Sequence, residues 1–226
     1  LRYPGSFNYA AIHNFAVPQA GGEYLILLNN DTEVRSEGWI EELLGLCQQD
    51  GVGAVGAKLY YPDGTIQHAG VVLGLCGVAS HLFIGADGER DGYAGRLVSV
   101  QDYSAVTAAC MMTRKAVYEQ VAGMEESLAV AYNDIDYCMK LQTAGWHVLF
   151  TPYAELTHYE SRSRGLEDTE EKQRRFQEEA RRFVQRWEAQ LDVGDPYYNP
   201  NLSVTKTDCS LRMPWEQEAW RKLCTD

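Results

Sequence analysis

Short apolar runs and longer amphipathic stretches alternate along the chain. The clearest apolar run covers residues 25–28, which is too short for a buried helix and is typical of a strand covered on both faces. Four polar residues follow it directly: Asn29, Asn30, Asp31 and Thr32. Open α/β sheets bind ligands outside the carboxyl ends of their strands, so these side chains mark a candidate site. An ordinary Asn/Asp turn explains the same four residues equally well.

The wider pattern predicts an α/β fold with a mixed, mostly parallel sheet. Further apolar runs predict strands over residues 52–60, 65–75 and 147–152. Apolar residues at helical spacing predict helices over residues 10–19, 36–50, 114–121, 133–144 and 168–191. Gly53 and Gly56 lie inside a predicted strand, where they indicate close packing or a bulge.

The helix predicted at residues 133–144 begins with a group of polar residues. Asn133 suits the N-cap position, and Asp134 and Asp136 lie in the first turn. Acidic side chains at this end oppose the helix dipole, which accounts for both aspartates without any function. A helix start also holds a carboxylate rigidly enough to act as a general base. The residue pattern alone leaves both interpretations open.

Composition narrows the class of protein. The 226 residues are 45% hydrophobic, which is enough for one domain with a core. The formal net charge is −12 and no basic stripe is present, which argues against nucleic-acid binding. Six scattered cysteines without a CxxC pair indicate buried thiols in a reducing compartment. No apolar run approaches the roughly 20 residues of a membrane span, which predicts no transmembrane segment and leaves peripheral membrane contact open.

Three segments resemble family 2 glycosyltransferases of the GT-A fold. They are LLNNDTEV at residues 27–34, NDIDYC at residues 133–138, and the downstream GWHVLFTP. The resemblance implies that Asp31 holds a divalent cation, Mn²⁺ or Mg²⁺, against the diphosphate of a nucleotide-sugar. It further implies that His158 completes the metal site and that Asp134 is the general base toward an acceptor hydroxyl. A cation between carboxylate and phosphate suits an acidic protein, because the metal is then the largest local charge.

The same resemblance assigns residues to the donor side of the site. Asn29 stands where many relatives have Asp, and it is expected near the donor together with Asn30. Arg162 and Arg164 are expected to clamp the diphosphate, because the fork of a guanidinium suits phosphate oxygens. A solvated loop explains the two arginines as well.

On the acceptor side the resemblance places Thr107, Asn133 and Asp136. Small residues around Thr107 would let a sugar approach the backbone, although tight core packing explains them equally well. Asn133 replaces the Glu of many relatives, and Asp136 is expected to orient the site. The segment at residues 58–75, KLYYPDGTIQHAGVVLGL, resembles an insertion in enzymes that build bacterial surface polysaccharides. His68 lies in this segment and His81 just after it, and neither is assigned to the site.

The resemblance covers the later part of the family's domain. Residues 1–165 are expected to form a partial GT-A domain, residues 166–200 its C-terminal helix and closing segment, and residues 201–226 an irregular arm. The part of the family domain that carries the nucleotide-base pocket has no counterpart in the sequence. We therefore expect a truncated or degenerate domain.

The implied function is sugar transfer with inversion, as in O-antigen and rhamnosyltransferase-like enzymes. The donor would be a UDP-, dTDP- or GDP-linked sugar, and the acceptor a hydroxyl of a growing or lipid-linked glycan. The expected location is the cytoplasm, with a position at the inner face of the cell membrane left open. An alternative is a non-catalytic remnant that binds glycans or assists assembly, because the nucleotide-binding half is absent. A sugar nucleotidyltransferase is disfavoured, because the sequence has no Gly-rich basic phosphate loop.

Overall fold

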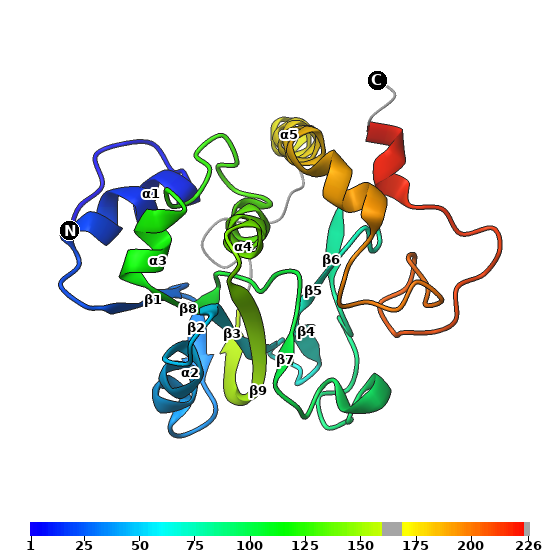
Figure 1. Ribbon diagram of the computed structural model, residues 1–226, viewed down its shortest axis with the longest axis horizontal. Helices are drawn as coiled ribbons and strands as arrows, with labels where there is room; N and C mark the ends of the chain where they lie inside the picture. Colours follow the sequence, from blue (N-terminus) through cyan, green and yellow to red (C-terminus); the bar gives the residue numbers. More distant parts are fainter. Residues whose placement is uncertain (160–168, 224–226) are drawn as a thin grey trace.

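The computed structural model describes residues 1–159 and 169–223, and its centre is a mixed β-sheet (Figure 1). The strand order is β1-β8-β3-β9-β2, with β4 added to β3 and β7 to β9. The strands of this sheet are β1 (Tyr24–Leu28), β2 (Thr32–Val34), β3 (Val52–Tyr60), β4 (Ile66–His68), β7 (Gln101–Asp102), β8 (Cys110–Arg114) and β9 (His147–His158). A separate antiparallel pair consists of β5 (Val71–Leu73) and β6 (Ala79–His81).

Three strands, β1, β3 and β9, run in one direction and supply most of the sheet. β3 and β9 pair in parallel, and β8 lies antiparallel between β1 and β3. The short strands β2, β4 and β7 are antiparallel to their neighbours. The predicted α/β fold with a mixed sheet is therefore confirmed, and the carboxyl ends of β1 and β9 lie at the same edge.

Helices cover both faces of the sheet (Figure 1). The buried apolar residues form two core clusters, one on each face of the sheet. Neighbouring residues of β8 point to opposite faces, so Met111 belongs to the larger cluster and Met112 to the smaller one. The smaller cluster packs α2 (Trp39–Cys47) on its face through Leu43 and Cys47. The larger cluster takes in α1 (Tyr9–Ala16), α3 (Lys115–Gln120), α4 (Asn133–Thr143) and α5 (Glu170–Val193). Short 3₁₀ turns lie at η1 (Val17–Gln19), η2 (Tyr93–Gly95) and η3 (Ala219–Leu223).

The five predicted helices are present, with shifts at their ends. The helix predicted from residue 36 begins at Trp39, after Gly38 in the left-handed region (φ 72°). Ser36 does not cap it, since its hydroxyl accepts from the Glu155 N–H (2.9 Å) and donates to the Tyr153 carbonyl (3.1 Å). A link to β9 thus replaces the predicted cap.

The prediction that the last strand ends at Pro152 was wrong, because the strand is longer. β9 continues to His158, and its register against β3 shifts so that Thr151 pairs with Ala57 but Glu155 pairs with Lys58. Pro152 falls in the unpaired stretch between them, where a residue without an N–H costs no ladder bond. The extension carries the strand onward to the turn that follows β1.

Close packing at the two strand glycines is confirmed. A Cβ on Gly56 would lie 2.4 Å from Cβ of Val106, and one on Gly53 would lie 2.7 Å from Cβ of Trp146. Contacts this short exclude any larger side chain without a shift of the neighbour. Gly56 therefore lets the segment that contains Val106 lie directly on β3.

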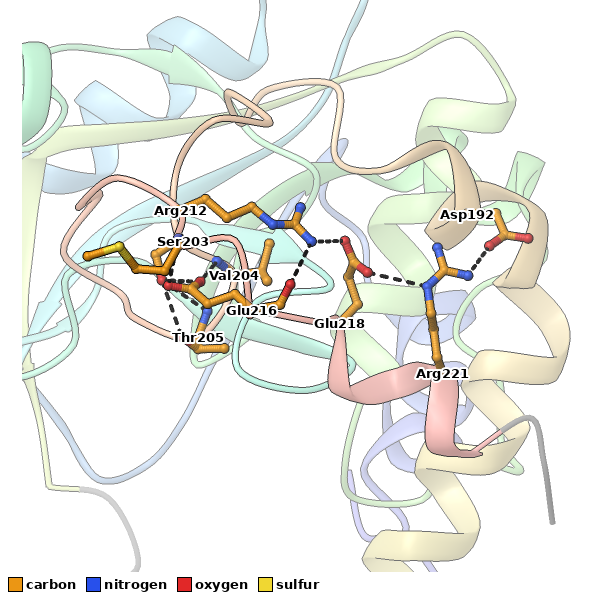
Figure 2. Close-up of polar contacts among 9 residues, drawn as sticks. Asp192, Ser203, Val204, Thr205, Arg212, Glu216, Glu218 and Arg221 are labelled. Atoms are coloured by element: carbon orange, nitrogen blue, oxygen red, sulfur yellow. Dashed lines mark hydrogen bonds and ion pairs between the residues drawn. The ribbon is translucent and has the colours of Figure 1, made fainter.

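The C-terminal segment, residues 195–223, packs beside β5 and β6 (Figure 1). One network of polar contacts holds it, joined at Arg212, which donates to both Glu216 and Glu218 (Figure 2). The Glu216 carboxylate accepts from the Ser203 hydroxyl (2.7 Å), and Glu218 pairs with Arg212 (2.7 Å). Arg221 bridges Glu218 (3.3 Å) to Asp192 at the end of α5 (2.7 Å), which ties the segment to the helix before it.

None of the helices in the described part of the chain combines the length and apolar character that a bilayer crossing needs.

Candidate active site

Asp31 and His158 meet at the carboxyl end of β1. The turn after β1 leads into β2, which pairs with β9 so that Thr32 lies opposite His158. The Tyr159 N–H donates to the Asp31 carbonyl (2.8 Å), which fixes the turn against the end of β9. Asp31 Oδ1 lies 3.1 Å from His158 Nε2, and the two side chains are 13% and 10% exposed. The fold thus brings together the two predicted metal ligands, which are 127 residues apart in sequence.

Asn29 and Gln67 contact the two nitrogens of the His158 ring. Asn29 Nδ2 lies 3.2 Å from Nε2, the ring nitrogen that also faces Asp31. On the other side of the ring, Gln67 Oε1 lies 2.7 Å from Nδ1, and Gln67 Nε2 donates to the His158 carbonyl (3.3 Å). Asn30 is exposed in the turn between β1 and β2.

Asp134 lies in the first turn of α4 and is partly exposed. Its Oδ2 accepts from the Ala108 N–H (3.2 Å) and its Oδ1 from the Ile135 N–H (2.9 Å). The Tyr9 hydroxyl donates to the Ala108 carbonyl (2.8 Å), and burial together with the nearby Asp134 charge raises the pKa of Tyr9. Two fixed N–H groups therefore orient the carboxylate. Each of its oxygens accepts one of these hydrogen bonds and keeps a second lone pair that could accept a proton.

Residues 107–109 connect the two ends of the site: the strand end, which is the Asp31–His158 pair, and the helix end, which is Asp134 at the start of α4. The Asn29 N–H donates to the Ala109 carbonyl (2.9 Å), and the neighbouring Ala108 is bonded to Asp134. The Thr107 hydroxyl accepts from the Ala109 N–H (3.3 Å), which closes a short turn in this segment. One stretch of backbone thus lies between the Asp31–His158 pair and the carboxylate of Asp134.

Asn133 and Asp136 face the interior behind α4. The Asn133 amide donates to the Leu128 and Val130 carbonyls (3.2 and 3.0 Å). Asp136 is fully buried, and its Oδ1 accepts from Trp187 Nε1 (2.9 Å) and Arg186 Nε (3.0 Å) of α5. Burial raises the pKa of Asp136, and it outweighs the opposing effects of these two partners. These contacts hold α4 in place, while a role for either residue on the acceptor side stays a prediction.

The expected donor-side clamp, Arg162 and Arg164, lies outside the described residues.

Two histidines that were not assigned to the site lie beside it. His68 is fully buried, with its Nδ1 2.7 Å from His81 Nδ1 and its Nε2 accepting from the Gly70 and Thr107 N–H groups (3.4 Å each). Burial, with smaller contributions from His81 and His158, holds the pKa of His68 well below its usual range. Because Nε2 accepts two bonds, the hydrogen of the neutral ring is on Nδ1 and is donated to His81.

The sequence held one signal for Gln67 and His68. They are polar residues inside a short apolar strand, and a buried polar side chain almost always has a hydrogen-bond partner. Their partners lie on distant segments, so the pattern could mark these residues but could not place them.

Comparison with known proteins places the chain among glycosyltransferases. A family model described as glycosyltransferase-like family 2 matches residues 6–181. The uncharacterized protein y4gI of Sinorhizobium fredii is 50% identical over 95% of this chain, and the O-antigen biosynthesis protein RfbC of Myxococcus xanthus is 40% identical over 100% of it. The chain spans only 24% and 18% of the length of these two relatives.

The fold has a counterpart among solved structures. A mannosyltransferase from Pyrobaculum calidifontis, in complex with GDP-Man and Mn²⁺, superposes with a TM-score of 0.51 over 84% of this chain and 45% of its own. Its sequence identity of 13% makes this a likeness of fold alone. With the family model covering most of its length and a fold like that of the GT-A enzymes, the chain belongs to glycosyltransferase-like family 2.

Proposed function

We propose that this chain carries the catalytic site of an inverting, metal-dependent sugar transferase that acts in surface-polysaccharide synthesis. The observation that supports this most directly is the 3.1 Å distance between Asp31 Oδ1 and His158 Nε2. Hydrogen bonds of residues 107–109 connect the turn that carries Asp31 to the carboxylate of Asp134. The relative named for O-antigen biosynthesis supports the polysaccharide assignment.

The Asp31–His158 pair fits one side of a divalent cation site. In octahedral coordination with ligands at about 2.1 Å, neighbouring ligand atoms lie about 3 Å apart, which matches the 3.1 Å separation. Carboxylate oxygen and neutral imidazole are both acceptable ligands for Mn²⁺. Within the described part of the chain, no three His, Cys, Asp or Glu side chains gather as a metal-binding group. Two protein ligands suit a cation that is also held by substrate phosphates and water.

The chemistry divides between the two ends of the site. A bound cation would supply positive charge that stabilises the departing diphosphate. Asp134 would accept the proton of the acceptor hydroxyl while the hydroxyl oxygen bonds to the anomeric carbon and the bond from that carbon to the diphosphate breaks. Attack from the side opposite the leaving group inverts the anomeric centre. Asn29 and Asn30 would contact the donor, and the clamp on the diphosphate expected of Arg162 and Arg164 stays a prediction from the sequence.

The assignment is tested by calorimetric titration of the chain with UDP, dTDP and GDP, each with and without Mn²⁺. Binding of one nucleotide only in the presence of Mn²⁺ would support the proposal and name the class of donor. Absence of binding to all three nucleotides in the presence of Mn²⁺ would contradict the proposal. A parallel titration with a glycan then tests the alternative, a non-catalytic glycan-binding module. A matching experiment with Mg²⁺ decides which cation the site prefers.

A further inference from the structure

Gln67 makes a two-point contact with His158 from a different strand. Its Oε1 lies 2.7 Å from ring Nδ1, and its Nε2 lies 3.3 Å from the backbone carbonyl of the same histidine. Both residues are buried, with 5% and 8% of their surfaces exposed. β4 and β9 both pair with β3, and the Gln67 side chain connects one of these neighbours to the other.

The carbonyl of His158 decides which way the Gln67 amide faces. A carbonyl oxygen only accepts, so the amide NH₂ of Gln67 must lie beside it. The Gln67 oxygen then faces ring Nδ1, and because this oxygen also only accepts, Nδ1 carries the hydrogen. A neutral imidazole has one N–H, so Nε2 presents a lone pair toward Asn29 and Asp31. The 3.2 Å contact from Asn29 Nδ2 to Nε2 fits the same assignment. Asp31 Oδ1, 3.1 Å from Nε2, favours a hydrogen on that nitrogen, so in the metal-free chain the two hydrogen bonds of Gln67 must outweigh the attraction of this carboxylate.

We infer that Gln67 is a positioning residue that holds His158 in its Nδ1–H tautomer, with Nε2 presented beside Asp31 as a ligand for a divalent cation. In water the neutral ring of histidine favours a hydrogen on Nε2, the form that cannot bind a cation there. The hydrogen bond to Gln67 reverses this preference and also fixes the ring plane, as partners of metal-binding histidines commonly do. The cation rests on the proposed function, whereas the tautomer does not.

An experiment can distinguish the positioning role of Gln67 from a role in packing alone. The residue after Gln67, His68, accepts from the Thr107 N–H (3.4 Å), so β4 is anchored to the site at a second point. Replacement of the Gln67 side chain by an apolar one of similar size should therefore keep the strand in place. A purely structural glutamine would leave the tautomer of His158 unchanged after such a replacement.

The test measures the tautomer first, in the metal-free 226-residue chain with ¹⁵N-labelled histidine, at a pH high enough that the histidine rings are neutral. Long-range ¹H–¹⁵N spectra distinguish a ring nitrogen that carries hydrogen from one that does not. The wild-type chain should show His158 with hydrogen on Nδ1 and none on Nε2, a result that needs no variant. Gln67→Met should move the hydrogen toward Nε2, whereas Gln67→Glu, which keeps an acceptor at this position, should retain it on Nδ1.

Gln101→Met is the matched control. The amide of Gln101 also donates to backbone carbonyls, those of Arg96 and Ser99, and its strand pairs with β9 at Phe150, away from the site. This variant should show the wild-type tautomer. Amide spectra of each variant check that the fold is kept.

Mn²⁺ affinity, measured by titration calorimetry, is the second readout. Gln67→Met should weaken binding about 10- to 100-fold, the usual effect of removing a hydrogen-bond partner of a metal ligand, with little change in Gln67→Glu or Gln101→Met. Hydrogen on Nε2 in the wild type, or an unchanged tautomer in Gln67→Met, would overturn the inference. If the tautomer responds as described but no form binds Mn²⁺, then Gln67 positions His158 and the proposed metal-dependent function fails instead.

Discussion

The two ends of the candidate site are assembled in different ways. Asp134 is placed by local structure, since the first turn of α4 positions it and Ala108 and Ile135 orient its carboxylate. Asp31 and His158 are placed by strand register, because they come within 3.1 Å only when β2 pairs with the far end of β9. Loss of the Asp134 carboxylate should therefore affect turnover more than Mn²⁺ binding, while loss of Asp31 or His158 should affect Mn²⁺ binding.

The largest expected effect is on turnover at the helix end. Asp134→Asn keeps an oxygen for the Ala108 N–H but removes the base, so kcat for sugar transfer should fall by about 10²- to 10⁴-fold. Mn²⁺-dependent nucleotide binding should stay at its wild-type level. Asp63→Asn, in the exposed turn before β4, is the control and should leave kcat unchanged. Near-normal turnover in Asp134→Asn would remove Asp134 from the role of base.

The strand end should show the opposite result. Asp31→Asn and His158→Ala each remove a proposed ligand, so Mn²⁺ affinity should fall by more than about 100-fold, beyond the usual effect of losing a partner of a ligand. Calorimetry measures this loss in the same titration that detects the nucleotide. Asp50→Asn changes an exposed carboxyl in the turn after α2, and this variant should bind Mn²⁺ as the wild type does. Retention of affinity in both site variants would place the cation elsewhere.

The contrast also explains how far sequence reasoning could go. The place of Asp134 in the first turn of a helix was predictable because a helix start is recognised from residues within one turn, whereas its role as a base came from the family resemblance and stays a prediction. The Asp31–His158 contact depends on the length of β9, and Pro152 led to a predicted strand that ended too early. Gln67 was visible only as a polar residue in an apolar strand, and its partner lies 91 residues away. Local geometry can be inferred from local sequence, whereas the register between distant strands cannot.

Asp136 lies two residues after Asp134 in the same helix, but we expect it to stabilise the fold and to take no part in the chemistry. Asp136→Ala leaves the buried Trp187 N–H without its acceptor and opens a small cavity, which should lower the free energy of unfolding by about 2–3 kcal/mol. Urea unfolding followed by circular dichroism measures the loss. Asp134→Ala, at a partly exposed position, should cost less than about 1 kcal/mol. Equal losses would mean that Asp136 is no anchor for α5.

The pH dependence of stability gives a second test of Asp136. Burial raises the pKa of Asp136 in the folded chain above its unfolded value, so the folded state binds more protons between these two values. The stability that this group contributes is complete below its unfolded pKa and is lost as the pH rises through the folded pKa. Asp136→Asn removes this loss, so its stability relative to the wild type should rise with pH across that window. Urea midpoints at a series of pH values measure the trend, and parallel curves would contradict the shift.

Gly56 lies under the segment that joins both ends, so its replacement should affect them together. Gly56→Ala places a Cβ about where Val106 already lies, 2.4 Å from its Cβ, and overpacking of this kind costs about 1–3 kcal/mol. Because relief of the clash displaces residues 107–109, both Mn²⁺ affinity and kcat should fall by a few-fold, unlike in any variant confined to one end. Gly45→Ala is the matched control, since nothing lies within 4 Å of a Cβ there and the helix α2 gains about 0.5–1 kcal/mol from the change. A Gly56→Ala chain that lost stability but kept both binding and turnover would show that the two ends are positioned independently of the backbone between them.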